Sequence, residues 1–221
     1  MITLHGFSYS NYYNIVKHVL LYKNIHFTED TQYGSNDDYL AISPVGKIPA
    51  LTTAEGVHLS ESSVCCDYLE ETCPEMPLYP ADTTERARIR QVMRISELYL
   101  ELPCRRLIPF VFTKTAPPDE LGKDILGVVD RGVGALNRLC TFDPYIAGAE
   151  LTMADIYLRY VMSVVDLIGG GALHRDIGAD IKGLKEWQTL MAQSDVSKKV
   201  DADQAANREE FFAMIKARMN G

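Results

Sequence analysis

The chain has 221 residues, 47% of them hydrophobic, so it can bury a substantial core in one large domain or two modest ones. Its 22 Lys and Arg against 30 Asp and Glu give a formal charge of −8, and basic residues never run longer than a pair. We expect no nucleic-acid partner, because the chain is acidic and its basic runs are short. We also expect no membrane, because uncharged apolar runs stay well short of the roughly 20 residues of a membrane span. The same features predict a cytoplasmic protein.

Residues 1–76 show the element order β-α-β-α-β-β-α. Short β-type runs between turn residues indicate strands, and an apolar stripe at helical spacing indicates a first helix that Asn24 closes in a left-handed conformation. The expected strands cover 1–4, 25–27, 50–53 and 57–59. The expected helices cover 11–23, 37–40 and 62–73. This order predicts a thioredoxin-like α/β domain with a mixed four-stranded sheet and helices on its faces.

Three prolines between 74 and 80 predict a stiff linker, assigned to 77–84, and the chain beyond it reads as helical. The expected helices cover 84–112 with a bend at Pro103, 118–140, a segment that opens at Thr152, 181–191 and 202–218. Residues 85–221 are therefore expected to form an all-α bundle of about five helices.

Two local patterns add detail to this helical region. Thr152 and Asp155 have the spacing of a capping box, which opens a helix. Gly127, Gly132 and Gly134 each weaken the 118–140 helix by roughly 1 kcal/mol relative to Ala. We therefore expect a neighbouring backbone to pass close to these glycines.

The five cysteines are an odd number and two are adjacent, which is a poor basis for a disulfide framework. We expect reduced thiols, with Cys65 and Cys66 packed inside a helix. The cysteines and the five histidines show no metal-ligand spacing, so the sequence predicts no metal site.

Residues 43–51 carry the first signal of a binding site. Ser43-Pro44 and Gly46 supply turn chemistry, and Pro49 begins an apolar strand, where a missing N–H is tolerated. A cis peptide bond costs under about 1 kcal/mol when it precedes proline. A cis bond at Pro49 would turn the N–H and C=O of Ile48 away from the sheet and leave them for an extended peptide ligand.

Residues 57–63 carry the second signal, because a strand ends there and a helix opens at Glu61 and Ser62. Hydroxyl and N–H groups at the start of a helix form a site for a carboxylate. Together with Ile48, they predict a site that holds a small acidic peptide at both ends.

Four motifs, in this order and spacing, resemble those of the cytosolic glutathione S-transferase family over nearly the whole chain. They are 43–51, 61–62, the 78–80 linker followed by 85–88, and 151–156. The resemblance implies a thioredoxin-like glutathione-binding domain and a helical domain that shapes the pocket for a hydrophobic electrophile. It also implies glutathione as co-substrate and a homodimer.

The family's glutathione contacts can be carried over where the motifs match. Ile48, before a cis-Pro49, would pair its backbone with the cysteinyl part of glutathione. Glu61 would take the amino group of the γ-glutamyl end and Ser62 its carboxylate, a role compatible with an ordinary helix cap. Lys47 matches a position that often faces a glutathione carboxylate, and a solvated turn lysine explains it nearly as well.

Ser10 is the first choice for activating the thiol, since it matches the serine of phi- and theta-like members just before the first helix. Tyr9, Asn11 and Tyr12 compete, because other classes use a tyrosine and some relatives an asparagine. Ser10 as a helix cap alone is the simpler interpretation.

The electrophile pocket is expected between the first turn and the bent fourth helix, with Tyr12, Arg105 and Ile108 as candidates. An Arg there would take an anionic group of the electrophile. The simpler interpretation is that Arg105 complements a helix dipole and that Ile108 packs in the core. Residues 193–196 depart from the family's usual Arg-Pro, so the resemblance does not predict how the pocket is closed.

The sequence thus predicts a glutathione transferase, and the alternatives are a non-catalytic ligand carrier or regulatory protein of this fold, or a glutathione-dependent peroxidase or isomerase. The chain has Phe7-Ser8-Tyr9-Ser10 where a thioredoxin-type enzyme has its C-x-x-C motif, so dithiol exchange lacks a nucleophile. This stretch also lacks the double-serine and cysteine motif of zeta-class isomerases, which disfavours maleylacetoacetate isomerisation.

Overall fold

Four short strands form a mixed sheet in the computed structural model, which describes residues 1–33 and 36–220. The strands are β1 (Ile2–Gly6), β2 (Phe27–Thr31), β3 (Ala50–Thr52) and β4 (His58–Ser60). Their order is β2-β1-β3-β4, with β1 parallel to β2 and the other pairs antiparallel. The mixed four-stranded sheet expected from the sequence is confirmed.

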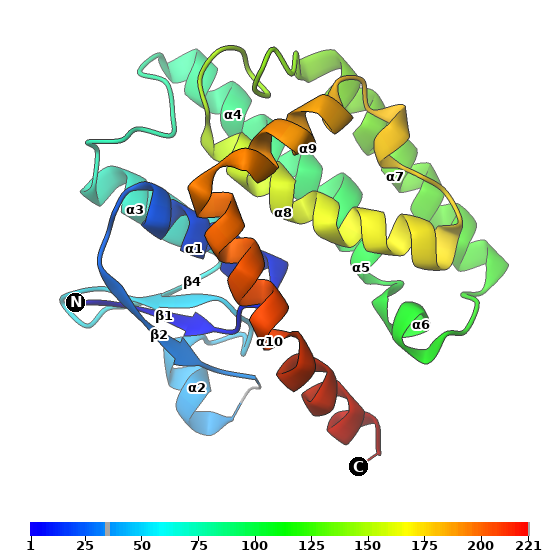
Figure 1. Cartoon of the computed structure of the whole chain (residues 1–221), viewed down its shortest axis with the longest axis horizontal. Coiled ribbons are helices and arrows are strands. Elements are labelled where there is room, and N and C mark those ends of the chain that lie inside the picture. Colours follow the sequence, from blue (N-terminus) through cyan, green and yellow to red (C-terminus); the bar gives the residue numbers. More distant parts are fainter. Residues whose placement is uncertain (34–35, 221) are drawn as a thin grey trace. The chain divides into compact units, whose positions relative to one another are not determined.

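The sheet belongs to the first of two compact units, which comprises Met1–Met76 and the residues from Gln193 onward. Its helices are α1 (Asn11–Tyr22), α2 (Asp37–Ile42), α3 (Ser62–Thr72) and α10 (Asp195–Asn220). Asn24, which follows α1, has a φ of 53°, as expected of the residue that closes this helix. The C-terminal helix α10 packs against α1 (Figure 1), so this unit includes a helix that the sequence boundaries had placed in 85–221.

The core of the first unit lies between the sheet and the α1–α3 pair. Leu4 and Leu51 are direct partners in the β1–β3 register, and both are fully buried with Val16 of α1 and Leu69 of α3. Cys65 and Cys66 of α3 are also fully buried, as predicted, and burial raises the pKa of the Cys65 thiol to about 12. Both thiols therefore act as small apolar groups in packing.

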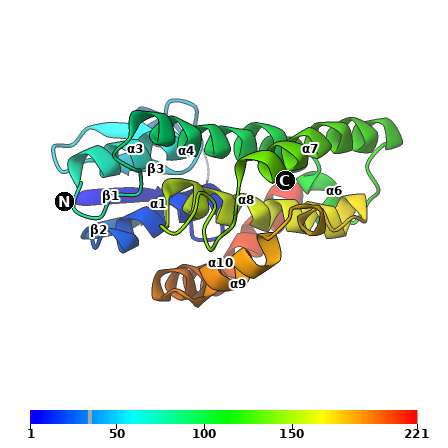
Figure 2. The ribbon, with the colours of Figure 1, turned by 90° about the horizontal axis from the view of Figure 1, so that it is seen from above.

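The second unit, Pro77–Ala192, is helical. Its elements are α4 (Thr83–Ser96), η1 (Glu97–Glu101), α5 (Leu102–Arg105), α6 (Ile108–Thr113), α7 (Asp119–Leu139), α8 (Met153–Ile168), η2 (Gly169–Leu173), η3 (Gly178–Asp180) and α9 (Leu184–Gln193). The helices α4 and α8 run side by side (Figure 2). With the α/β first unit, this mostly helical part confirms the predicted fold class.

The predicted long helix over 84–112 is interrupted before its proline. Residues Glu97–Glu101 form a π-helical turn, in which the N–H of Leu102 donates to the C=O of Glu97. Pro103 has no N–H to bond Tyr99, so the α-helical ladder cannot continue through this point. The break therefore appears as a π turn followed by the short helix α5.

The glycines of α7 differ from one another in their surroundings. A Cβ added at Gly132 would lie 2.9 Å from the Cβ of Tyr99 and 3.1 Å from its carbonyl oxygen, so the predicted close approach is confirmed there. At Gly134 an added Cβ would meet the Arg138 side chain at 3.2 Å, and at Gly127 no described atom lies within 4 Å. The prediction is thus wrong for Gly127 and also for Gly134, which meets a side chain of its own helix and no neighbouring backbone.

The predicted capping box opens α8. The buried Asp155 carboxylate accepts hydrogen bonds from the N–H groups of Ile146 and Thr152 and from the indole of Trp187, each at 2.8 Å, and from the Thr152 hydroxyl at 2.7 Å. One carboxylate therefore joins the start of α8 to the preceding loop and to α9.

Met153–Leu173 is long and apolar enough to cross a membrane by length and composition, with a mean hydropathy of 1.3. However, 61% of the apolar window is buried inside the protein. A core helix satisfies the same criteria, and the burial marks this segment as the core of the second unit.

Candidate functional site

Strand register brings the two predicted binding stretches to one end of the sheet. Ala50, the first residue of β3, pairs with Ser60, the last residue of β4, and also with His5 near the end of β1. The chain just before β3, just after β4 and just after β1 therefore meets at this end. These are the segments that carry Ile48, Glu61 and Ser10.

The peptide bond between Ile48 and Pro49 is cis, as expected. Pro49 is buried and Ile48 precedes β3, so the backbone of Ile48 lies outside the ladder that begins at Ala50. The loop is held from α2, because Ser43 and Tyr39 donate hydrogen bonds to the C=O of Lys47 at 2.7 Å and 3.1 Å. Burial raises the pKa of Tyr39 to about 12, so its hydroxyl stays protonated well above neutral pH.

Gly6 shows how closely β1 approaches this loop. With a φ of 143°, it adopts a backbone conformation that side chains rarely allow, and a Cβ there would lie 3.3 Å from the Cβ of Ile48. The same Cβ would lie 2.6 Å from the ring of Tyr13. The glycine thus lets the end of β1 pass directly beside Ile48.

Glu61 occupies a strained position at the start of α3, with a φ of 69° and a ψ of 119°. Such a conformation costs about 1–3 kcal/mol for a non-glycine residue and concentrates at functional sites. Its C=O accepts the first hydrogen bond of α3 from Cys65 at 3.0 Å, while its side chain is exposed. Ser62, the first residue of α3, is buried at 5% exposure beside the N–H groups that open the helix.

Ser10 is the N-cap of α1, and its Oγ accepts the N–H of Tyr13 at 3.4 Å. This distance exceeds the usual 2.7–3.2 Å range of such bonds, so the capping bond is weak. The hydroxyl acts in it as an acceptor, and its own proton stays available to a ligand. The cap and the predicted catalytic role are therefore compatible.

The neighbours of Ser10 differ in what their side chains do. The Tyr13 hydroxyl donates to Glu29 at 2.5 Å, and burial followed by this bond raises its pKa, so it is poorly suited to activate a thiol. Asn11 is buried at 5% exposure, and Tyr12 is half-buried on α1. The ring of Tyr9 stacks on Phe211 of α10, with centroids 4.4 Å apart.

The other predicted residues lie in both units. Lys47 is exposed in the first unit, and Ile108 begins α6 in the second. Arg105 forms an ion pair with Glu101, whose side chain is fully buried, with Nε donating to Oε1 at 2.8 Å. Its guanidinium therefore compensates a buried carboxylate, which accounts for Arg105 without a ligand.

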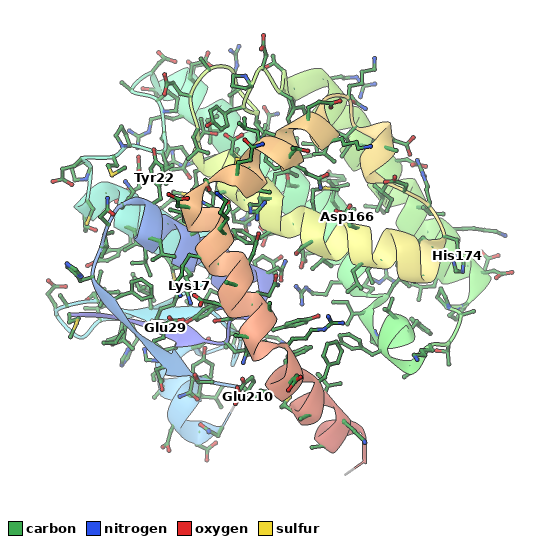
Figure 3. The ribbon with its side chains drawn as sticks, viewed as in Figure 1. Lys17, Tyr22, Glu29, Asp166, His174 and Glu210 are labelled. Carbon is green, nitrogen blue, oxygen red and sulfur yellow. The ribbon has the colours of Figure 1, made fainter. Side chains whose placement is uncertain are left out.

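The C-terminal helix supplies contacts that the sequence did not predict. Lys17 of α1, with its side chain 3% exposed, forms ion pairs with Glu29 at 2.7 Å and with Asp203 of α10 at 2.8 Å. Lys17 and Glu29 lie beside α10 in Figure 3. Despite some burial, the pairs with Lys17 and Lys199 hold the pKa of Asp203 below its usual range.

Among residues 1–33 and 36–220, no group of three or more His, Cys, Asp or Glu side chains is placed to hold a metal ion.

Residues 4–77 match the family model described as "Glutathione S-transferase, N-terminal domain". A protein of Pseudomonas putida named "Glutathione S-transferase" is 37% identical over 218 residues, which cover 98% of this chain and 99% of that protein. The chain belongs to the glutathione S-transferase family. As a member it is a glutathione transferase, and the predicted family is confirmed.

The transferase is also similar to a more distant relative and to a solved structure. "Probable maleylacetoacetate isomerase 1" of Drosophila melanogaster is 32% identical over 129 residues, 55% of this chain and 48% of that protein. A solved glutathione transferase homologue from Sulfitobacter, with bound glutathione, shares the fold with a TM-score of 0.73 at 21% identity. That likeness covers 91% of this chain and 97% of the other.

Proposed function

We propose that this glutathione transferase ionises the thiol of glutathione with the hydroxyl of Ser10 and transfers the thiolate to a small hydrophobic electrophile. The observation that carries the proposal is the convergence of three segments at one end of the sheet, those of Ser10, Ile48 and Glu61. Each offers a different group, namely a hydroxyl, a free backbone edge and a helix start.

Glutathione would lie extended across these segments. The N–H and C=O of Ile48 pair with the cysteinyl part, as a strand pairs with a sheet edge. Glu61 takes the γ-glutamyl amino group, while Ser62 and the N–H groups at the start of α3 take its carboxylate. Lys47 is exposed and reaches the other carboxylate of the peptide.

Ser10 would help the thiol of glutathione to lose its proton. A thiolate is stabilised by a donated hydrogen bond and by the positive end of a helix, as reactive cysteines show. Ser10 supplies the donor and α1 the helix. The thiol proton passes to solvent, the sulfur attacks the electrophilic carbon, a C–S bond forms, and the leaving group departs with the electrons of its bond. Positioning and thiolate stabilisation supply most of the rate gain.

We propose that Tyr12 of the first unit contacts the electrophile, whereas the pairing of Arg105 with the buried Glu101 argues against a substrate role for Arg105. The aromatic rings of Tyr9, Phe211 and Phe212 lie together in the first unit and support an apolar substrate. We propose in addition that the protein is cytoplasmic and conjugates electrophiles in detoxification. We also propose a serine-type, phi- or theta-like member that forms homodimers.

Substitution of Ser10 tests the proposal directly. We expect Ser10→Ala to lower kcat for the conjugation of a chloronitrobenzene roughly hundredfold, since a hydrogen-bond donor to the reacting charge is lost. Calorimetric binding of glutathione should change little. Tyr9→Phe and Asn11→Ala are the matched controls and should retain most activity. If Ser10→Ala leaves turnover unchanged and one of the controls abolishes it, the assignment of Ser10 is wrong.

Glutathione-dependent isomerisation is the second candidate, and the similarity to a maleylacetoacetate isomerase over 55% of the chain favours it. The stretch Ser8-Tyr9-Ser10 lacks the expected cysteine, which argues against it. Turnover of a cis-dienoic acid with glutathione, measured by ultraviolet absorbance alongside the chloronitrobenzene, would distinguish the two. Isomerisation far faster than conjugation would favour this second function.

A further inference from the structure

The C-terminal helix α10 packs on the first unit through one face. Val200 and Phe211 of this face are buried, and Asp203 pairs with the buried Lys17 of α1. Asn207 lies between Asp203 and Phe211 at steps of four residues, so all of these side chains point the same way. The face that packs is therefore partly polar, and it brings Asn207 to the loop between β1 and α1.

Asn207 holds the main chain of Tyr9. The N–H of Tyr9 donates to Oδ1 of Asn207 at 3.1 Å, across 198 positions of sequence. On the other side of the residue, Gln204 donates to the C=O of Tyr9 at 3.5 Å. The Phe211 ring stacks on that of Tyr9 with an interplanar angle of 20°. Both the backbone and the ring of Tyr9 are thus set by α10.

The amide of Asn207 is itself fixed in orientation. Its Nδ2 donates to the Tyr33 hydroxyl at 2.6 Å and to Oε2 of Glu210 at 3.1 Å. Two acceptors on the nitrogen side leave the oxygen side facing Tyr9. An aspartate at this position could still accept from Tyr9 but could not donate to Tyr33 or Glu210.

The rest of the loop is held by nearby residues. Asn14 donates to the C=O of Ser8 at 2.9 Å, and the N–H of Ser10 donates to the C=O of Phe7 at 3.1 Å. These bonds fix the two ends of the turn. The peptide group between Ser8 and Tyr9 is therefore held at both ends, by Asn14 at the C=O of Ser8 and by Asn207 at the N–H of Tyr9, and Ser10 follows directly.

We propose that Asn207 is a positioning residue that sets the hydroxyl of Ser10 through the main chain of Tyr9, an inference that rests on the proposed role of Ser10. Loss of the bond from Tyr9 leaves this peptide group held only at its C=O, by Asn14, and the looser main chain moves the Ser10 hydroxyl relative to the thiolate. Errors of about 1 Å in such positions reduce rates by up to a hundredfold. The proposed contacts of Ile48, Glu61 and Ser62 with glutathione do not depend on Asn207. Loss of Asn207 should therefore weaken thiol activation and leave glutathione binding unchanged.

Three variants of the full chain test this role. We expect Asn207→Ala to lower kcat about tenfold and to move the acidic limb of the pH profile of kcat/KM to higher pH by about one unit, because the thiolate loses stabilisation. The ultraviolet absorbance of bound thiolate should shift in the same way, and the Kd of glutathione should stay within about twofold. Asn207→Asp keeps an acceptor for Tyr9 but loses both donations and sets a second carboxylate beside Glu210, so it should recover only part of kcat. The exposed Glu209→Ala should match the wild type.

Thermal unfolding separates this outcome from a structural one. If Asn207→Ala lowers activity only in proportion to the folded fraction, with an unchanged acidic limb, the inference is overturned.

The double variant Ser10→Ala/Asn207→Ala distinguishes failure of this inference from failure of the proposed function. If Asn207 acts through Ser10, its substitution should not move the acidic limb further in the Ser10→Ala background. An undiminished second shift overturns the inference while Ser10 keeps its role. If Ser10→Ala by itself has no effect, the proposed function fails and this inference fails with it.

Discussion

Asp155 in the second unit and Asn207 in the first both join a helix to a distant part of its own unit, but their partners lie at different distances in the sequence. Asp155 bonds Thr152 and Ile146, three and nine positions away, as well as Trp187. Asn207 reaches back 198 positions to Tyr9 and 174 to Tyr33. The comparison shows that the local bonds of Asp155 form a motif that is recognisable in sequence, whereas the bond from Asp155 to Trp187 and those from Asn207 to Tyr9 and Tyr33 join remote residues and are hidden.

Replacement of Asp155 should have the largest effect on stability and would test the structural half of this comparison. Asp155→Ala leaves the N–H groups of Ile146 and Thr152 and the Trp187 indole without their acceptor, and we expect a loss of about 3 kcal/mol or more. Urea unfolding measures it. Asp155→Asn keeps one acceptor oxygen and should lose less. Activity per folded molecule should be unchanged in both, and a shifted pH profile would contradict the contrast with Asn207.

Backbone contact in the second unit can be tested with a matched pair of glycines on α7. Gly132→Ala places a Cβ against Tyr99 and should destabilise the protein by about 1–3 kcal/mol through overpacking. Gly127→Ala adds a Cβ with no described atom within 4 Å and should stabilise the helix by about 0.5–1 kcal/mol. Thermal unfolding compares the two. Equal changes in stability for the two substitutions would show that helix propensity, and not the close approach of Tyr99 in η1, determines the effect at Gly132.

The ion pair between Asp203 and Lys17 gives the smallest effect and tests how α10 is held. Because the folded pKa of Asp203 is lowered, its stabilisation is present above the unfolded pKa, about 4, and is lost as pH falls through the folded value. We expect Asp203→Asn to lower the free energy of unfolding by about 1 kcal/mol at pH 7. The variant should also lose less stability than the wild type as the pH falls below about 4.

Urea titrations of this variant and the wild type across pH 2–7 provide the measurement, with Glu209→Ala as the control on the same helix. An unchanged acid profile in Asp203→Asn would mean that other carboxylates control the acid response of the first unit.

Local patterns were enough for much of this molecule. The order of strands and helices, the capping box at Thr152 and the burial of Cys65 and Cys66 follow from periodicity and short-range chemistry, which depend on neighbours along the chain. The proline signal at Pro49 and the start of α3 at Ser62 likewise located the site segments. Family motifs added the choice of Ser10, which no periodicity reveals.

Tertiary structure decided the remainder. The strained backbone of Glu61, the difference between Gly127 and Gly132, and the position of Tyr9 depend on atoms that are distant in sequence. The docked face of α10 mixes Val200 and Phe211 with Asp203 and Asn207, so it carries no clear apolar stripe. Its polar groups are only partly exposed, and partners on α1 and in the loop after β1 satisfy them; only the folded chain brings those partners together.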